Sequence, residues 1–176
     1  AGLFAQSEWK FTRSSILLGA RLDKHNLIDR FIVSPRLTYL RDLKPDLQWR
    51  SSFSTGYRAP QAFDEDLHIT AVGGEVQLIV LDPDLKPEHS DSYSMSADFY
   101  KQFGKVQTNL LIEGFYTDIK DIFYLNETGT DADGNTILTR TNGSGAVVKG
   151  LNIEAKVVPS AKMNFQGGFT IQRSLY

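Results

Sequence analysis

Cysteine is absent from this sequence of 176 residues, which excludes disulfide bonds and thiolate metal sites. The three histidines, His25, His68 and His89, lie too far apart for a zinc site, and we interpret them as surface loop residues. There is no run of about 18 apolar residues, which excludes a transmembrane helix. Neither sign of charge predominates, and the net charge of −2 gives no reason to expect a nucleic-acid partner.

An initiator methionine and a signal peptide are also lacking. The chain begins inside a strand-like pattern at residues 1–4 and stops inside another at residues 171–176. We therefore expect residues 1–176 to form one partial domain, cut from a longer one.

What the sequence does contain is an alternation of apolar and polar residues with a period of two, which is typical of β-strands. This pattern predicts an all-β protein whose antiparallel strands follow one another in up-and-down order. Most of the strands reach the roughly 9–11 residues that a tilted strand needs to cross a bilayer. The eight predicted strands are residues 3–11, 15–23, 34–41, 47–56, 90–101, 106–125, 145–158 and 163–173.

The alternation predicts a sheet with one apolar and one polar face. The strand at 106–125 is less regular than the others, because Leu111 and Phe115 fall on its polar face. The residues expected on the apolar face are Ile16, Leu18, Leu22, Trp49, Phe53, Met95, Phe99, Ile153, Phe165, Phe169 and Ile171.

Short and long connections alternate along the chain. Short turns at 12–14, 42–46, 102–105 and 159–162 are separated by long segments at 24–33, 57–89 and 126–144, within which Val76–Leu81 is a candidate local strand. Outer-membrane barrels have this alternation and carry aromatic girdles near the membrane surfaces. Phe11, Trp49, Phe99 and Phe165 lie close to the short turns. These features favour a barrel over a β-sandwich, which the strand pattern alone fits equally well.

Several segments resemble, in order and spacing, the barrel of TonB-dependent receptors. Leu18–Asp23 is similar to the strand that these receptors write as Gly-x-Arg-x-Asp. Phe53–Pro60 is similar to their Gly-Phe-Arg-Ala-Pro segment, with Tyr57 in place of Phe. Asp82–Glu88 is similar to Asn-Pro-x-Leu-Lys-Pro-Glu, with Asp82 in place of Asn, and residues 148–154 resemble a later strand.

The resemblance implies a fold and a function. The fold is a 22-stranded outer-membrane barrel with a plugged lumen, of which this chain would be a part of the C-terminal half without the plug domain or TonB box. The function is import of a scarce nutrient, such as an iron chelate, cobalamin or a glycan, across the outer membrane of a Gram-negative bacterium. The implied partners are membrane lipid on the apolar face, the plug domain of the same chain, TonB through the N-terminal region, and the nutrient.

Two other functions stay open at this point. A passive outer-membrane porin would show the same strands and loops, and a soluble β-sandwich could serve as a ligand-binding module. We expect no enzyme and no cofactor, because no catalytic constellation is present. Residues 131–135 have the wrong spacing for a calcium loop and predict a turn. Asp64–Asp66 is interpreted as a solvated acidic run and Gly73–Gly74 as a bend.

The candidate ligand-binding residues are those charged side chains that fall on the polar faces or where a strand meets a long loop. In a barrel these faces line the lumen, where the side chains contact either the ligand or the plug, or else pair with one another across strands. The loops 57–89 and 126–144 are the expected ligand side, and Pro60 is expected to end strand pairing. The candidates are Arg21, Arg36, Arg50, Arg58, Glu113 and Glu154.

Overall fold

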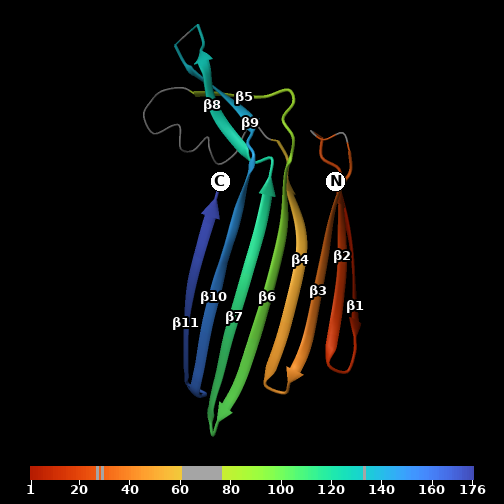
Figure 1. Ribbon diagram of the computed structural model, residues 1–176, viewed down its shortest axis with the longest axis vertical. Coiled ribbons are helices and arrows are strands. Elements are labelled where there is room, and N and C mark those ends of the chain that lie inside the picture. The colour runs from red at the N-terminus through yellow and green to blue at the C-terminus, as the bar shows by residue number, and fades with distance from the viewer. Residues whose placement is uncertain (27, 29, 61–76, 133) are drawn as a thin grey trace.

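The computed structural model describes residues 1–26, 28, 30–60, 77–132 and 134–176. Eight long strands form one curved antiparallel sheet, and three shorter strands form a second sheet beyond one of its ends (Figure 1). The large sheet has the order β1-β2-β3-β4-β6-β7-β10-β11, so that neighbours in sequence are neighbours in space. Its strands are β1 (Gly2–Lys10), β2 (Ser14–Asp23), β3 (Ile32–Lys44), β4 (Leu47–Arg58), β6 (Glu88–Phe103), β7 (Val106–Lys120), β10 (Gly145–Ser160) and β11 (Met163–Leu175).

The eight predicted strands are confirmed, each within a few residues of its expected bounds except one. That strand, predicted at 106–125, ends at Lys120 as β7. The chain then turns at Asp121, whose φ of 55° lies in the left-handed region, and a new strand begins at Phe123 in the other sheet. The prediction was wrong because apolar residues continue past the turn, at Ile122, Phe123 and Leu125, and hide it from a periodicity argument.

The small sheet has the order β5-β9-β8. It consists of β5 (Gln77–Leu81), β8 (Phe123–Thr130) and β9 (Thr136–Asn142). The local strand expected near 76–81 is therefore confirmed as β5, whereas β8 and β9 form a hairpin inside a segment predicted as loop. β5 pairs parallel with β9, which corrects the expectation that every pair would be antiparallel.

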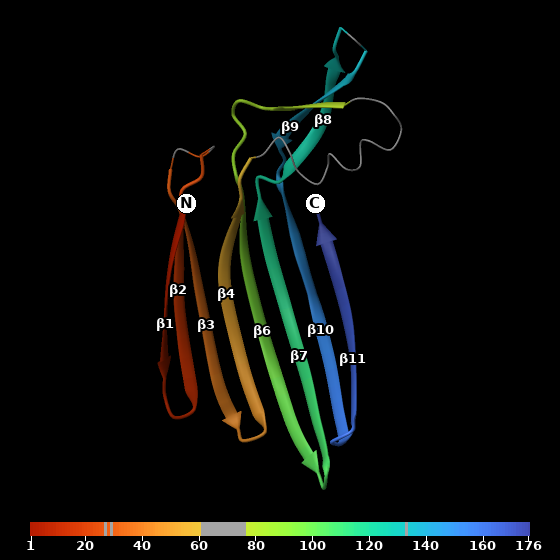
Figure 2. The same ribbon diagram turned by 180° about the vertical axis from the view of Figure 1, so that it is seen from behind.

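All four short turns lie at one end of the large sheet, called here the turn end, and the three long connections lie at the other, the loop end (Figures 1 and 2). The long connections run over 24–31, 59–87 and 121–144, and the last two carry the small sheet. Both views place the small sheet beyond the loop end. The predicted alternation of connections is thereby confirmed for the described residues.

The register sorts the side chains onto two faces, since residues paired across antiparallel strands point the same way. Ile16 pairs with Tyr39, Trp49 with Ala97, and Phe99 with Leu110. Followed from strand to strand, the pairing puts all eleven residues predicted for the apolar face on one face. Leu111 and Phe115 lie on the other, polar face, as expected.

Among the residues that the structure describes, neither face of the large sheet is packed into a core. The buried hydrophobic residues include one small cluster at the loop end, formed by Ile28, Ile32 and Ala59 with Tyr57 packed against it. In contrast, Phe165 and Phe169 on β11 are 61% and 62% exposed. The soluble β-sandwich is wrong, because its two sheets would bury their apolar faces against each other, whereas the eight strands form a single sheet. No helix of the described residues is long and apolar enough to cross a membrane.

Candidate functional site

The polar face carries all six charged residues predicted as candidates. The strand register shows this, because residues directly opposite each other on neighbouring strands share a face. Arg21 is opposite Ser34, Arg50 is opposite Ser96, and Ser96 is opposite Glu113. Side chains of one face alternate with those of the other along each strand, so the common face follows from residue parity. The six are Arg21, Arg36, Arg50, Arg58, Glu113 and Glu154.

A hydrogen-bonded row crosses the middle of this face. Asn152 Nδ2 on β10 donates to Glu113 Oε2 on β7 at 3.1 Å, and Thr170 Oγ1 on β11 donates to Asn152 Oδ1 at 2.9 Å. The row therefore links three strands through side chains in addition to their backbone ladders. It holds the Glu113 carboxylate in a fixed place on the wall.

The six residues do not pair with one another as ions within the described part of the chain. Arg21 pairs with Asp23 and Arg58 with Glu88, while Arg36, Arg50 and Glu154 are in no ion pair among the described residues. Mutual pairing across strands is therefore the wrong interpretation of these charges. Their predicted contact with a ligand or a plug stays a prediction.

The loop end of the polar face has a hollow of about 510 Å³ where β2 and β4 end and β3 begins. It brings together Arg21 and Arg58, which are 37 positions apart in sequence, with Asp23, His25 and Ser34 in the lining. Arg21 Nε donates to Asp23 Oδ2 at 2.6 Å, and Asp23 is only 4% exposed. A buried carboxylate needs such a partner, because an unpaired one is costly. The pair fixes the edge of the hollow.

Arg58 connects the hollow to the base of the small sheet. Its Nη1 lies 3.6 Å from Glu88 Oε2, and the other carboxylate oxygen of Glu88 accepts the backbone N–H of Phe123 at 2.6 Å. Arg58 and Arg140 both lie over the Phe123 ring, with Cζ at 5.1 Å and 5.8 Å from its centroid. Cation–π contacts of this kind orient guanidinium groups.

The sequence analysis did not identify Phe123 and Arg140 as site residues. In the structure Arg140 is completely buried and lies over the Phe123 ring. Both fall in segments where the predicted elements were wrong, at the end of the strand extended to 125 and inside the loop 126–144. The only available signal was an arginine within the alternating run Thr136–Asn142, which is typical of a strand.

The Asn142 side chain forms three hydrogen bonds to backbone atoms at the base of the small sheet. Its Oδ1 accepts the backbone N–H of Lys86 at 2.7 Å, while its Nδ2 donates to the carbonyl oxygens of Lys86 at 2.9 Å and Asp121 at 2.7 Å. One side chain thus ties the segment before β6 to both ends of the β8–β9 hairpin. These bonds position the small sheet on the loop end of the wall.

The segment considered as a calcium loop forms a turn at the tip of the β8–β9 hairpin. Asp131 accepts the backbone N–H and the side-chain amide of Asn135, each at 2.8 Å, and Gly134 has a φ of 88°. The predicted turn is confirmed, with Asp133 outside the described residues. The described part of the chain has no cluster of three or more potential metal ligands. Asp64–Asp66 and Gly73–Gly74 lie outside the described residues.

The family model described as "TonB dependent receptor-like, beta-barrel" matches residues 1–176. No curated protein matches the sequence. The siderophore receptor PirA from Pseudomonas aeruginosa superposes with a TM-score of 0.79 at 18% identity, over 98% of this chain and 34% of that one. PirA from Acinetobacter baumannii gives 0.70 at 20%, over 97% and 27%.

The FrpB iron transporter from Neisseria meningitidis superposes with a TM-score of 0.71 at 14% identity, over 98% of this chain and 25% of that one. At such identities the likeness shows the fold alone. The chain spans between a quarter and about a third of the length of these three solved structures.

Proposed function

Since this chain belongs to the TonB-dependent receptor β-barrel family, we propose that it forms eight strands in the wall of a receptor that imports an iron chelate across the outer membrane of a Gram-negative bacterium. The observation that carries the proposal is the division of the sheet into an apolar and a polar face, with every described long connection at one end.

Lipid is the environment that suits the apolar face. Most of its large side chains stay exposed in the sheet, with Ile171 at 59% in addition to Phe165 and Phe169. Removing apolar surface from water gains about 25 cal/mol per Å². Every strand of the large sheet has between 9 and 16 residues, which suffices for a tilted crossing. The polar face then lines the lumen, against the plug domain of the same receptor.

An iron chelate is favoured over cobalamin or a glycan for two reasons. The solved structures named above include siderophore receptors and an iron transporter. In addition, the hollow at the loop end contains Arg21 and Arg58, and guanidinium groups bind anionic oxygens strongly. The proposed ligand contacts are Arg21 and Arg58 first, with Arg36, Arg50, Glu113 and Glu154 farther along the lumen.

The proposal includes energy coupling through TonB and excludes catalysis by the chain itself. A passive porin is the alternative that uses the same wall without energy. Membership in the receptor family argues against it, since a plugged lumen needs an energy-driven opening.

The test is uptake of radioactive iron by an iron-starved bacterial host that lacks its own siderophore receptors and expresses the receptor containing this chain. A panel of ferric siderophores is supplied. We expect uptake of at least one of them, abolished when the host tonB gene is deleted. Uptake that persists without TonB would favour the porin, and no uptake of any chelate would overturn the choice of ligand.

Two variants and a control address the site. Arg21→Gln and Arg58→Gln should each lower the apparent affinity for the ferric chelate, by about tenfold if one charged hydrogen bond is lost. Arg13→Gln, on the turn at the opposite end of the sheet, is the control and should behave as wild type. Equal affinities in all three variants would contradict the assignment of the hollow as the ligand side.

A further inference from the structure

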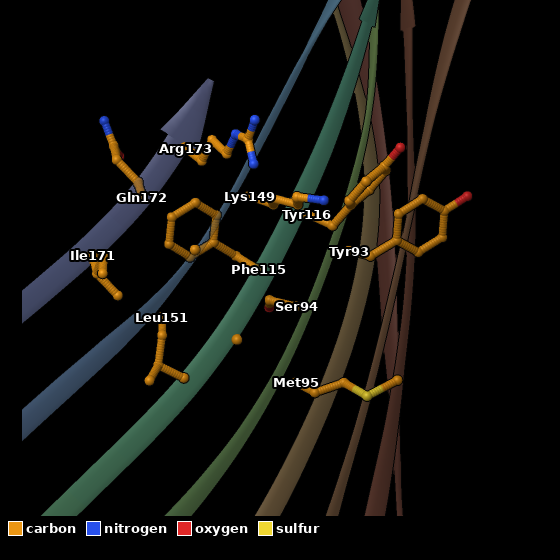
Figure 3. A pocket seen from close by; sticks show the side chains of 12 residues that line it. Tyr93, Ser94, Met95, Phe115, Tyr116, Lys149, Leu151, Ile171, Gln172 and Arg173 are labelled. Atoms are coloured by element: carbon orange, nitrogen blue, oxygen red, sulfur yellow. The ribbon is translucent and has the colours of Figure 1, made fainter. Parts of the chain in front are cut away.

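Near the loop end, the apolar face carries a row of four polar or aromatic side chains from four adjacent strands, with the pair Val147 and Leu175 beyond it. The register pairs Tyr93 with Tyr116, Tyr116 with Lys149, and Lys149 with Arg173. One step nearer the turn end, the same strands present Met95, Gly114, Leu151 and Ile171. Two aromatic side chains and two cations therefore form the border between apolar surface and the loop end (Figure 3).

The two cations lie directly opposite each other. Like charges in directly opposed positions of a sheet repel and destabilise it. Both side chains are exposed, and neither forms an ion pair with any residue that the structure describes. In contrast, Lys120, which lies on the same face nearer the loop end of β7, does form ion pairs. Its Nζ lies 3.0 Å from Asp91 Oδ2 and 3.8 Å from Asp118 Oδ2. An anion between Lys149 and Arg173 would relieve the repulsion.

A groove continues from the cations down the apolar face. Its volume is about 870 Å³, and its lining includes Met95, Leu151 and Ile171. The floor is at Gly114, where an added Cβ would meet no atom within 4 Å. A hydrocarbon chain is the occupant that suits such a groove, since its walls are apolar. Charge at one end and an apolar groove below it together match an amphiphile.

The depth of the cations agrees with a lipid headgroup. On β11 the apolar face presents Met163, Phe165, Phe169 and Ile171, and Arg173 follows, with Leu175 as the last residue of the strand beyond it. The eight residue-to-residue steps from Phe165 to Arg173 span about 26 Å along the strand at roughly 3.3 Å each. With a tilt of about 40°, this becomes about 20 Å across the membrane, close to the roughly 25 Å of an outer-membrane apolar band.

We propose that Lys149 and Arg173 bind the phosphate of a membrane lipid of the outer leaflet, whose acyl chain lies in the groove over Gly114. This inference rests on the proposed placement of the sheet in the outer membrane. The phosphate accepts charged hydrogen bonds from the ammonium and guanidinium groups. Tyr93 and Tyr116 lie beside the headgroup, on the Lys149 side, at the level where aromatic residues prefer to lie.

The test uses the receptor that contains this chain, purified in detergent, and two probes that differ only in the phosphate: dioleoyl phosphatidic acid and dioleoylglycerol. Native mass spectrometry measures lipid bound per receptor, and inorganic phosphate is a third probe. The Lys149→Gln/Arg173→Gln variant should bind phosphatidic acid about tenfold or more weakly than wild type. The matched control is Arg41→Gln/Lys101→Gln, which removes the same charges from the same face at the turn end.

Gly114→Leu, which fills the groove without touching the charges, should also weaken phosphatidic acid binding. Equal binding of the two lipids, or an equal loss in the control variant, would overturn the proposal. Tight binding of inorganic phosphate with no effect of Gly114→Leu would show an ion site instead and would also overturn it. Uptake of the ferric chelate, measured in the same variants, should be unchanged. Absent uptake with intact lipid selectivity would refute the proposed ligand alone.

Discussion

Gly114 and Gly150 lie on adjacent strands of the sheet, one residue apart in register, and we expect opposite responses to the same substitution. Gly114 is on the apolar face of β7, where an added Cβ would meet no atom within 4 Å. Gly150 is on the polar face of β10, opposite Phe115. There a Cβ would overlap the carbonyl oxygen of Ile171 and lie 2.7 Å from Phe115 Cζ.

The expected magnitudes follow from these contacts. Gly114→Ala removes the backbone freedom of glycine from the unfolded state and should stabilise by about 0.5–1 kcal/mol. Gly150→Ala must displace the backbone of β11, since the carbonyl of Ile171 is part of the ladder and cannot rotate away. Overpacking of this kind costs about 1–3 kcal/mol. The two variants should therefore differ by roughly 1.5–4 kcal/mol in the free energy of unfolding.

The measurement is urea unfolding of the receptor containing this chain in detergent micelles, followed by tryptophan fluorescence. Phe115→Leu in the Gly150→Ala background should restore part of the loss, because it removes the ring but leaves the backbone contact. Equal stabilities of the two alanine variants would refute the reasoning from these contacts. Full restoration by Phe115→Leu would show that the backbone contact is not the obstacle.

Three further predictions concern the loop end, the apolar face and the hairpin tip. Asn142→Ala removes three hydrogen bonds and should lower the local stability of the β8–β9 hairpin by about 2 kcal/mol, which faster amide hydrogen exchange of the hairpin would show. The control Asn126→Ala removes one hydrogen bond to Thr141 and should change the exchange little. Residues 1–176 alone in detergent-free buffer should associate through the apolar face and unpaired edge strands; light scattering should show an oligomer that Phe165→Asp and Phe169→Asp weaken, and a monomer would contradict the assignment. Calorimetry should find no submicromolar calcium binding, because Asp131 already caps its own turn.

The wall was predictable from sequence because one rule, the alternation of apolar and polar residues, holds along most of each of its strands. Side chains at Phe165, Phe169 and Ile171 follow that rule whatever their partners, so both strand and face can be assigned without knowing the neighbours. The alternation of short and long connections then predicts which connections lie together at each end of the sheet. The alternation is weaker along β7, where Leu111 and Phe115 lie on the polar face. It predicted a wrong strand end beyond Lys120, where the chain leaves the wall and the pairing changes without a change in the hydrophobic pattern.

The site was predictable only in part, for a related reason. Parity puts Arg21 and Arg58 on the polar face, but their partners depend on contacts between distant segments. Glu88 is 30 residues beyond Arg58, and the Phe123 ring is 35 residues beyond Glu88. The position of Phe123 is set by hydrogen bonds from the Asn142 side chain to backbone atoms, which no local pattern encodes.

The same physics accounts for a close superposition at low identity. In the proposed membrane placement, Phe169 or Ile171 on the apolar face could be replaced by another apolar residue, since lipid makes no shape-specific demand on the outside of a wall. Register is held by the short turns and the backbone ladder, which are largely indifferent to side-chain identity. A TM-score of 0.79 at 18% identity is then the expected behaviour of such a sheet. We expect replacement to be tolerated least where backbone contacts or a buried charge set the geometry, among them at Gly150, Asp23 and Asn142.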